Sequence, residues 1–148
     1  MTQKITPFLW FDGRIEEAVQ FYTKIFPNSR VHGVSKQSAT LELEGQRLML
    51  FNGGAHYQLS PAVSLFVSCQ TQAEIDRLWT QLTAGGGQDS YCGWLKDKFG
   101  LSWQLVPTQL ESMLRHPDPA RAKRVMAAMM HMNKLNIAKL QQAFDLES

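Results

Sequence analysis

The sequence predicts an α+β protein made of two β-α-β-β-β modules followed by C-terminal helices. Three observations indicate this fold class. Two stretches have the apolar spacing of an amphipathic helix, and each follows a short strand-like run. Further strand-like runs, bounded by turn residues, come after each helix. The two halves also resemble each other at an offset of 57 residues, which places Tyr22 on Trp79 and Ile25 on Leu82.

The first module is expected over about residues 4–54. Its opening strand, Lys4 to Phe11, is broken by Gly13, and the helical spacing of Arg14–Phe26 stops at Pro27-Asn28. Three short strands should follow before a turn at residues 52–54. They are Arg30–Ser35, Ala39–Leu43 and Arg47–Phe51.

The second module is expected over about residues 62–107. Its opening strand runs from Ala62 to Ser68, and Thr71 is expected to cap a helix over Gln72–Thr83. After the three glycines at positions 85–87, strands are expected near Ser90–Lys96 and Leu101–Val106. Residues 1–107 would then form one domain.

Residues 108–148 are expected to form a helical extension. Thr108 can cap a short helix through Leu114, and Asp118 with Pro119 opens a second helix as its N-cap and first residue. An interruption at residues 133–136 precedes a last helix that ends near Phe144. The methionines of the second helix either fill the core or are buried against a partner subunit; they are Met126, Met129 and Met130.

Composition limits the class of protein. A chain of 148 residues, 44% apolar and 19% charged, is typical of a soluble globular protein. The net charge is +2 without a basic run, so no nucleic-acid partner is expected. The short apolar run at the N-terminus is followed at once by Asp12 and Arg14, which predicts neither a signal peptide nor a membrane span. Cys69 and Cys92 are then expected to be free thiols of a cytoplasmic protein.

Alternation along the strands divides their side chains between two faces. One set is wholly apolar and is expected to face the helices: Phe8, Trp10, Leu48, Leu50, Leu65, Val67, Trp103 and Leu105. The opposite set mixes apolar and polar side chains, as a small-molecule pocket requires. The residues expected to bind a ligand there are Leu9, Phe11, Met49, Phe51, Ser64, Phe66, Ser68 and Gln104.

Particular stretches resemble a known family. Paired modules with the helix EEAVQFYTKIFPNS are similar to the glyoxalase/bleomycin-resistance fold of the vicinal oxygen chelate superfamily. Within this superfamily, several stretches resemble the PhnB-like branch, which is labelled 3-demethylubiquinone-9 3-methyltransferase. They are ITPFLWFDGRIEEAVQFY, SLFVSCQTQAEIDRLW, CGWLKDKFGLSWQLVP and PDPARAKRVMAAMM with its trailing KLNIAKLQQAF. The resemblance implies this fold and a homodimer, but no particular reaction.

The resemblance also implies where a metal would be held, on the opening and closing strands of each module. Those positions fall near Pro7, Met49, Ser64 and Gln104. Proline offers no donor, a thioether suits soft copper, and a serine hydroxyl is a poor ligand. We therefore expect no metal and no cofactor. Gln104 is either a strand residue bonded to a neighbour or water, or a pocket amide that contacts a polar ligand.

The leading hypothesis is a cytoplasmic protein that binds a small, partly apolar molecule in a metal-free sheet cavity, with catalytic residues unknown. One alternative is a methyltransferase acting on a quinone precursor, although no glycine-rich loop follows Phe11. Others are a metal-dependent lyase or dioxygenase of the superfamily, and a structural protein whose cavity is filled by its own aromatic side chains. Cys69, just before a helix N-terminus, is either a thiol of lowered pKa or an inert one.

Overall fold

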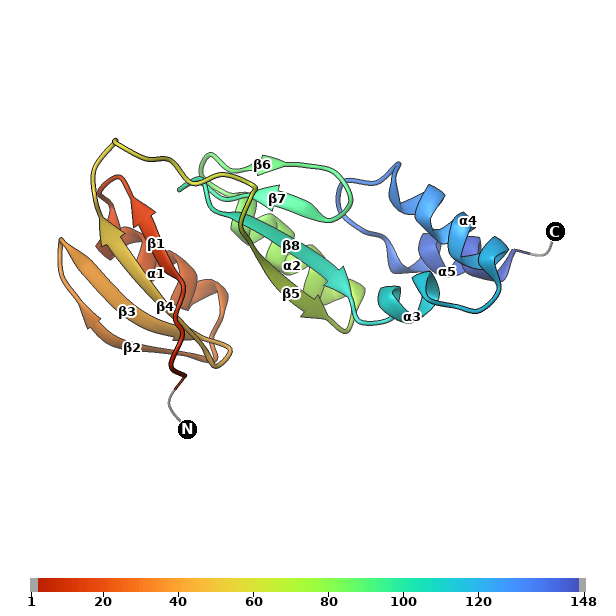
Figure 1. The fold of residues 1–148 in the computed structure, drawn as a ribbon, viewed down its shortest axis with the longest axis horizontal. Helices are drawn as coiled ribbons and strands as arrows, with labels where there is room; N and C mark the ends of the chain where they lie inside the picture. The colour runs from red at the N-terminus through yellow and green to blue at the C-terminus, as the bar shows by residue number, and fades with distance from the viewer. Residues whose placement is uncertain (1–2, 147–148) are drawn as a thin grey trace. The chain divides into compact units, whose positions relative to one another are not determined.

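The computed structural model describes residues 3–146. The chain forms two compact units, residues 1–60 and 61–148, each of which contains one module. Figure 1 shows the order of the strands and helices along the chain.

Unit 1 contains one helix and a mixed sheet of four strands in the order β1-β4-β3-β2. The strand β1 pairs parallel to β4, and the remaining pairs are antiparallel. Because parallel strands need a long crossover, α1 and the β2–β3 hairpin stand between β1 and β4 in the sequence. The elements are β1 (Phe8–Phe11), α1 (Ile15–Ile25), β2 (Ser29–Val34), β3 (Ser38–Leu43) and β4 (Gln46–Asn52).

Unit 2 repeats this arrangement, with the strand order β5-β8-β7-β6. The predicted duplication is therefore confirmed. The single strand expected over residues 90–96 is instead a hairpin of two short strands, because Cys92 and Gly93 turn the chain at φ values of 60° and 89°. The elements are β5 (Ser64–Cys69), α2 (Gln72–Thr83), β6 (Gln88–Asp89), β7 (Trp94–Lys96) and β8 (Ser102–Pro107).

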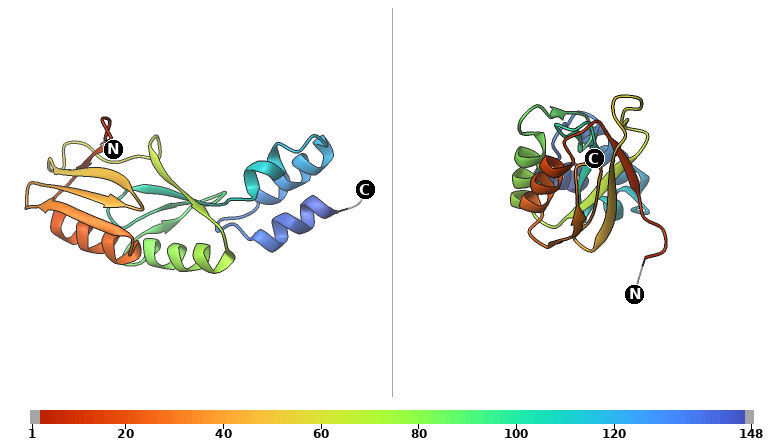
Figure 2. Two further views of the ribbon diagram at one scale, coloured as in Figure 1. Left: turned by 90° about the horizontal axis from the view of Figure 1, so that it is seen from below. Right: turned by 90° about the vertical axis from the view of Figure 1, so that its left-hand side faces the viewer.

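One helix covers one face of each sheet (Figure 2). The apolar residues that predicted the helices are the ones that they bury: Ile15, Ala18, Val19, Tyr22 and Ile25 on α1, and Ile75, Leu78, Trp79 and Leu82 on α2. The predicted cap of α2 is confirmed, since Thr71 Oγ1 accepts a hydrogen bond of 3.1 Å from the Glu74 N–H.

The face prediction is wrong for β1. Leu9 and Phe11 are 6% and 3% exposed and belong to the core under α1, whereas Phe8 is 57% exposed. The cause is one extra residue between strand and helix. Three residues, 12–14, separate β1 from α1, whereas two residues, 70 and 71, separate β5 from α2. The offset that aligns the two helices therefore leaves β1 out of phase with β5 by one residue. A shift of one residue moves every side chain of a strand to the opposite face of the sheet.

The described part of the C-terminal extension, residues 108–146, contains three helices: α3 (Leu110–Leu114), α4 (Pro119–Met129) and α5 (Ile137–Asp145). Asp118 caps α4 as predicted, accepting a 3.0 Å hydrogen bond from Ala120. Thr108 does not cap α3; its N-cap is Gln109, without a side-chain hydrogen bond. The helices enclose a small apolar core of Leu110, Met113, Val125, Leu135 and Leu140. Within residues 3–146, none of the helices has the length and apolar character needed to span a membrane.

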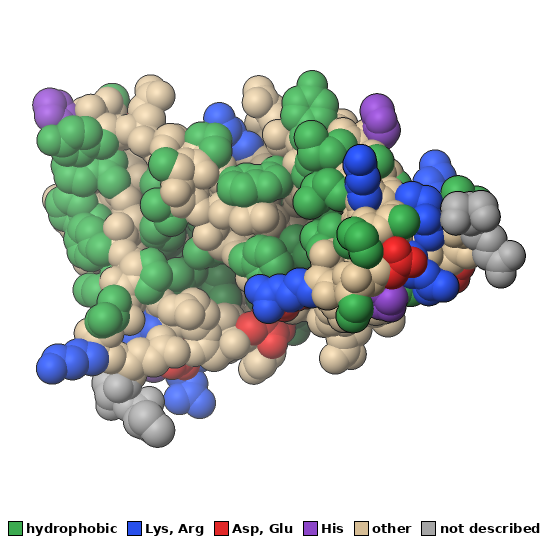
Figure 3. Space-filling view, turned by 45° about the vertical axis from the view of Figure 1, so that its right-hand side comes forward, with side chains coloured by type: hydrophobic (Ala, Val, Ile, Leu, Met, Phe, Trp, Pro, Cys, Tyr) green, Lys and Arg blue, Asp and Glu red, His purple; other side chains and the backbone are tan. Residues whose placement is uncertain are grey.

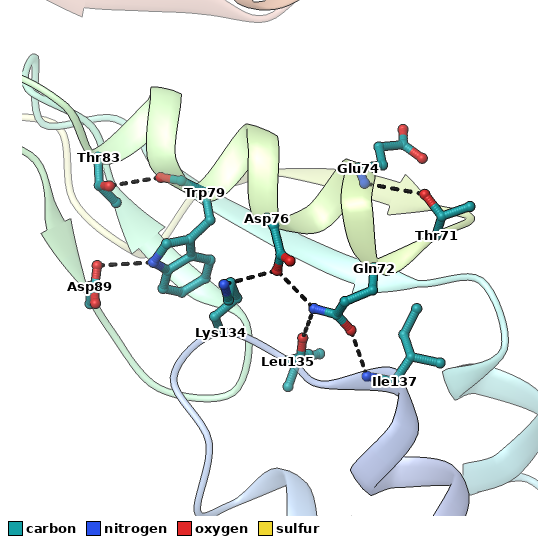
Figure 4. Close-up of polar contacts among 10 residues, drawn as sticks. All are labelled: Thr71, Gln72, Glu74, Asp76, Trp79, Thr83, Asp89, Lys134, Leu135 and Ile137. Carbon is teal, nitrogen blue, oxygen red and sulfur yellow. Dashed lines mark hydrogen bonds and ion pairs between the residues drawn. The ribbon is translucent and has the colours of Figure 1, made fainter.

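The segment between α4 and α5 is held against α2 by one side chain. Figure 4 shows the Gln72 amide between them: its nitrogen donates to the Leu135 carbonyl at 3.0 Å, and its oxygen accepts from the Ile137 N–H at 2.8 Å. Lys134 forms an ion pair of 2.8 Å with Asp76, one turn further along α2. The extension therefore packs onto unit 2 as part of the same compact body.

Candidate functional site on the open sheet faces

Each sheet has an open face on the side away from its helix. In unit 1 this face carries an aromatic group. The register pairs Phe8 with Met49 and Trp10 with Phe51, so these four side chains point to the same side. The Phe8 and Phe51 rings lie 5.5 Å apart, and the Trp10 and Phe51 rings lie 5.4 Å apart. The face is thus a contiguous and partly exposed aromatic surface.

The loop after β4 completes this aromatic surface. The Trp10 indole N–H donates to the Gly54 carbonyl at 2.9 Å, and the Tyr57 ring contacts the Trp10 ring edge-on at 4.9 Å. A Cβ atom at Gly53 would lie 2.1 Å from the indole, so this position requires glycine. Sequence reasoning missed Trp10, which it placed on the helix side, and Tyr57, for which the sequence carries no periodic signal.

In unit 2 the open face is more polar. Phe66 is directly opposite Gln104 in the register and is 58% exposed. The Gln104 amide nitrogen donates to the Ser64 hydroxyl oxygen at 2.9 Å. The amide nitrogen of Gln104 is therefore bonded to a neighbouring side chain, while its oxygen is still available for the ligand contact of the second alternative. Among the described residues of unit 2, none donates to its carbonyl oxygen, which leaves a neutral acceptor beside an exposed phenyl ring.

The eight residues expected to bind a ligand separate into two groups. Met49, Phe51, Ser64, Phe66, Ser68 and Gln104 belong to the half-buried or exposed positions of strands β4, β5 and β8. Leu9 and Phe11 do not, because they point into the core; Phe8 and Trp10 take their place on the open face of β1. Hydrophobic side chains are visible at the surface in Figure 3.

Cys69 is an inert thiol rather than an activated one. It is fully buried at the end of β5, where its Sγ donates to the Val67 carbonyl at 3.7 Å. Burial, with a smaller contribution from the Glu74 carboxylate, raises the pKa of Cys69 to about 11. These effects outweigh the helix N-terminus, so the thiolate is scarce at neutral pH.

The donor atoms on these faces do not fit a divalent metal ion of the superfamily type. The positions implied by the resemblance supply one thioether (Met49), one hydroxyl (Ser64) and one amide (Gln104). Among residues 3–146, no three His, Cys, Asp or Glu side chains come together as a ligand group. His32 and His116 are engaged elsewhere: His32 Nε2 lies 3.4 Å from the Glu42 carboxylate, and His116 Nδ1 accepts from the Asp118 N–H.

Paired β-α-β-β-β modules with mixed four-stranded sheets define a protein of the glyoxalase-like α+β class. Residues 3–106 match the family model described as 3-demethylubiquinone-9 3-methyltransferase, and the chain belongs to this family. The match to the family ends at residue 106, before α3. The extension, including the PDPARAKRVMAAMM stretch, therefore lies outside the match. No curated protein matches the chain.

Solved structures agree with this assignment. A PhnB protein from Bacillus cereus, described as a candidate 3-demethylubiquinone-9 3-methyltransferase, is 35% identical, with a TM-score of 0.66 over 72% of this chain and 100% of its own. A glyoxalase-related enzyme from Fulvimarina pelagi (17% identity, TM-score 0.56, 74% and 91% covered) shares the fold. So does the fosfomycin resistance protein FosX from Listeria monocytogenes (16% identity, TM-score 0.56, 75% and 97% covered).

Proposed function

We propose that this protein binds a small, partly apolar molecule on its open sheet faces without the help of a metal ion. The observation that carries the proposal is the Gln104–Ser64 hydrogen bond beside the exposed Phe66 ring. The bond holds the amide in one orientation, so its carbonyl and the Ser64 hydroxyl hydrogen are available to a polar group of the ligand. Apolar walls with a few oriented polar groups are typical of small-molecule sites.

The aromatic surface of unit 1 supports the same function. Large aromatic side chains are seldom left exposed together unless they serve a contact, and here Phe8 and Tyr57 are 57% and 61% exposed. Their rings offer apolar area with little rotamer entropy to lose on binding. The proposed binding residues are Phe8, Trp10, Met49, Phe51, Ser64, Phe66, Ser68 and Gln104.

A ligand screen with matched variants tests the proposal. Ligand-observed NMR against a library of small aromatic and carbonyl compounds should yield hits for the wild-type chain. Gln104→Leu should weaken these hits by roughly threefold to tenfold, since a neutral hydrogen bond contributes about 0.5–1.5 kcal/mol. Gln20→Leu, which removes an exposed amide on α1, is the control and should leave them unchanged. If the hits bound both variants as tightly as they bind the wild-type chain, Gln104 would not belong to the binding site.

The two enzyme alternatives are decided by separate measurements. Metal analysis of the purified protein that found stoichiometric Mn, Zn or Ni, together with turnover lost on adding a chelator, would replace the proposal by a metal-dependent reaction. Micromolar binding of S-adenosylmethionine in calorimetry would instead favour the methyltransferase named in the family description. We expect neither, since the donor set does not fit the first and no glycine-rich loop follows β1 for the second.

We also propose a cytoplasmic homodimer. Its support is the two free cysteines and the apolar side chains exposed on α4 and at its C-cap, Met126 and Met130. Light scattering on the purified protein should give twice the mass of the chain, 16.8 kDa. A monomer at micromolar concentration would contradict this.

A further inference from the structure

Two sulfur atoms from distant parts of unit 2 meet at its surface. Cys92, in the turn between β6 and β7, places its Sγ 3.9 Å from the Sδ of Met130, at the C-cap of α4. Two backbone hydrogen bonds join the turn to the segment after α4. The Cys92 N–H donates to the Met132 carbonyl at 2.8 Å, and the Gly93 N–H donates to the Asn133 carbonyl at 2.7 Å. The fold therefore holds the backbone segments that carry Cys92 and Met130 close together.

A third sulfur atom belongs to the same surface. The Met130 N–H donates to the Met126 carbonyl at 3.0 Å, a helical bond between residues four apart. Side chains at this spacing lie on one face of a helix. Met126 and Met130 are 43% and 60% exposed, whereas Met129 and Met132 pack against the apolar core of the extension. Core packing thus explains Met129 and Met132, and leaves Met126 and Met130 for either the dimer interface proposed above or a ligand.

The three sulfur donors have the chemistry of a soft-metal site. Thiolate and thioether ligands select Cu(I) over the harder divalent ions. With metal–sulfur bonds of about 2.3 Å, the length found for zinc thiolates, two ligands at trigonal angles lie about 4 Å apart. The observed separation of 3.9 Å between Sγ and Sδ meets this requirement without rearrangement of the backbone.

We propose that Cys92, Met130 and Met126 form a binding site for a soft monovalent cation, Cu(I). On binding, the Cys92 S–H bond breaks and its proton passes to solvent, while the sulfur forms a bond to the metal ion. Both thioethers donate lone pairs, and no electron is transferred. This site is independent of the ligand site on the open sheet faces, and either can exist without the other.

Competition with a chromophoric Cu(I) chelator under anaerobic conditions tests the site in the full-length protein. The wild-type chain should withdraw one equivalent of Cu(I). Cys92→Ser and Met130→Leu should each weaken binding by at least roughly tenfold, since even outer-shell changes at metal sites have effects of that size. Met126→Leu should weaken it less, because the short sulfur–sulfur approach is the one between Cys92 and Met130. Leucine preserves the shape of methionine and removes only the sulfur.

Two matched controls and a structural readout complete the experiment. Met129→Leu changes a half-buried methionine of the same helix that packs against the apolar core, and Cys69→Ala removes the buried cysteine; both should bind Cu(I) as the wild type does. Unchanged melting temperatures show that the variants fold. X-ray absorption of the Cu(I) protein should show sulfur ligands.

Three outcomes would overturn the proposal. The first is wild-type affinity for Cu(I) in both Cys92→Ser and Met130→Leu, and the second is coordination by nitrogen and oxygen alone. The third is no Cu(I) uptake by the wild-type chain, which would be explained if a dimer also shielded Met126 and Met130 from oxidation by hydrogen peroxide. The last outcome would assign these methionines to a partner subunit.

Discussion

At the scale of single residues, the buried carboxylate of Asp97 organises the turn between β7 and β8. It is 1% exposed. One oxygen accepts from the N–H groups of Phe99 and Leu101 at 2.9 and 3.1 Å, and the other accepts from the Trp103 indole at 2.9 Å. Hydrogen bonds to a charged acceptor are stronger than neutral ones, so these bonds offset the burial of the charge.

Asp97→Ala should be strongly destabilising. The substitution leaves three donors of the turn without this acceptor, and we expect the free energy of unfolding to fall by about 3 kcal/mol or more. Urea denaturation followed by tryptophan fluorescence measures the change. Asp12→Ala, at an exposed turn of unit 1, is the control and should cost less than about 0.5 kcal/mol. Equal effects of the two substitutions would contradict the role assigned to Asp97.

The two cysteines should differ in reactivity. At pH 8 the Cys69 thiolate, with a pKa of about 11, is only about a thousandth of the population, and the side chain is fully buried. Cys92 is partly exposed. Iodoacetamide should therefore label Cys92 alone in the native protein and both cysteines in urea, as read by mass spectrometry. Native labelling of Cys69 at a comparable rate would show that its surroundings open readily.

At the scale of secondary-structure elements, the helices could be predicted, whereas the phase of β1 and the turn at Cys92 and Gly93 could not. The apolar spacing of α1 and α2 is local, and so are the caps Thr71 and Asp118; all of these were predicted correctly. The faces of β4, β5 and β8 also agree with the prediction. The face of β1 depends on one residue in the loop that follows it, and no periodicity reveals the length of a loop.

The packing of the extension against α2 also could not be predicted from the sequence. Gln72 was predicted only as the first residue of a helix, yet its amide bonds to residues 63 and 65 positions away. Such long-range partners leave no local pattern. The same holds for Gln104 and Ser64. Their place on the same face of the sheet was predicted, but the hydrogen bond between them, across 40 positions of the sequence, was not.

Gln72→Ala should loosen the segment between α4 and α5. The substitution removes an acceptor of the Ile137 N–H and a donor to the Leu135 carbonyl, so local opening should become easier by about 1–2 kcal/mol. Hydrogen exchange should show faster exchange at Ile137. Gln81→Ala, further along α2, is the control. Exchange at Ile137 that is equally slow in both variants would show that the apolar core alone holds the segment.

The ion pair beside Gln72 should make this docking dependent on pH. Hydrogen bonds from Lys134 and Gln72 hold the pKa of the Asp76 carboxyl below its ordinary value of 3.8. A lowered pKa means that the stabilising contribution is complete above pH 3.8 and is lost as the pH falls through the folded value. Exchange at Ile137 should therefore accelerate in acid relative to the intrinsic rate. Lys134→Met should remove part of that acid dependence, and an identical pH profile in this variant would refute the assignment.

At the scale of the whole molecule, the family fold and the extension contribute differently. Residues 3–106 suffice for the family match, and 72% of this chain covers all of the Bacillus cereus PhnB structure. The extension nevertheless belongs to unit 2, where it accepts hydrogen bonds from Cys92 and Gly93 and covers Val106. We infer that it braces the hairpin of β6 and β7, which is short and lies at the edge of its sheet.

A chain truncated after Pro107 should fold but be less stable. Its sheets retain every strand pair, so the far-ultraviolet circular dichroism should keep its β-sheet signal. The extension supplies several hydrogen bonds of about 1 kcal/mol each and covers apolar surface, so unfolding should require about 3–5 kcal/mol less. Trp94 and Trp103 report on unit 2 during urea denaturation. Identical midpoints for the two chains would mean that the extension rests on unit 2 without stabilising it.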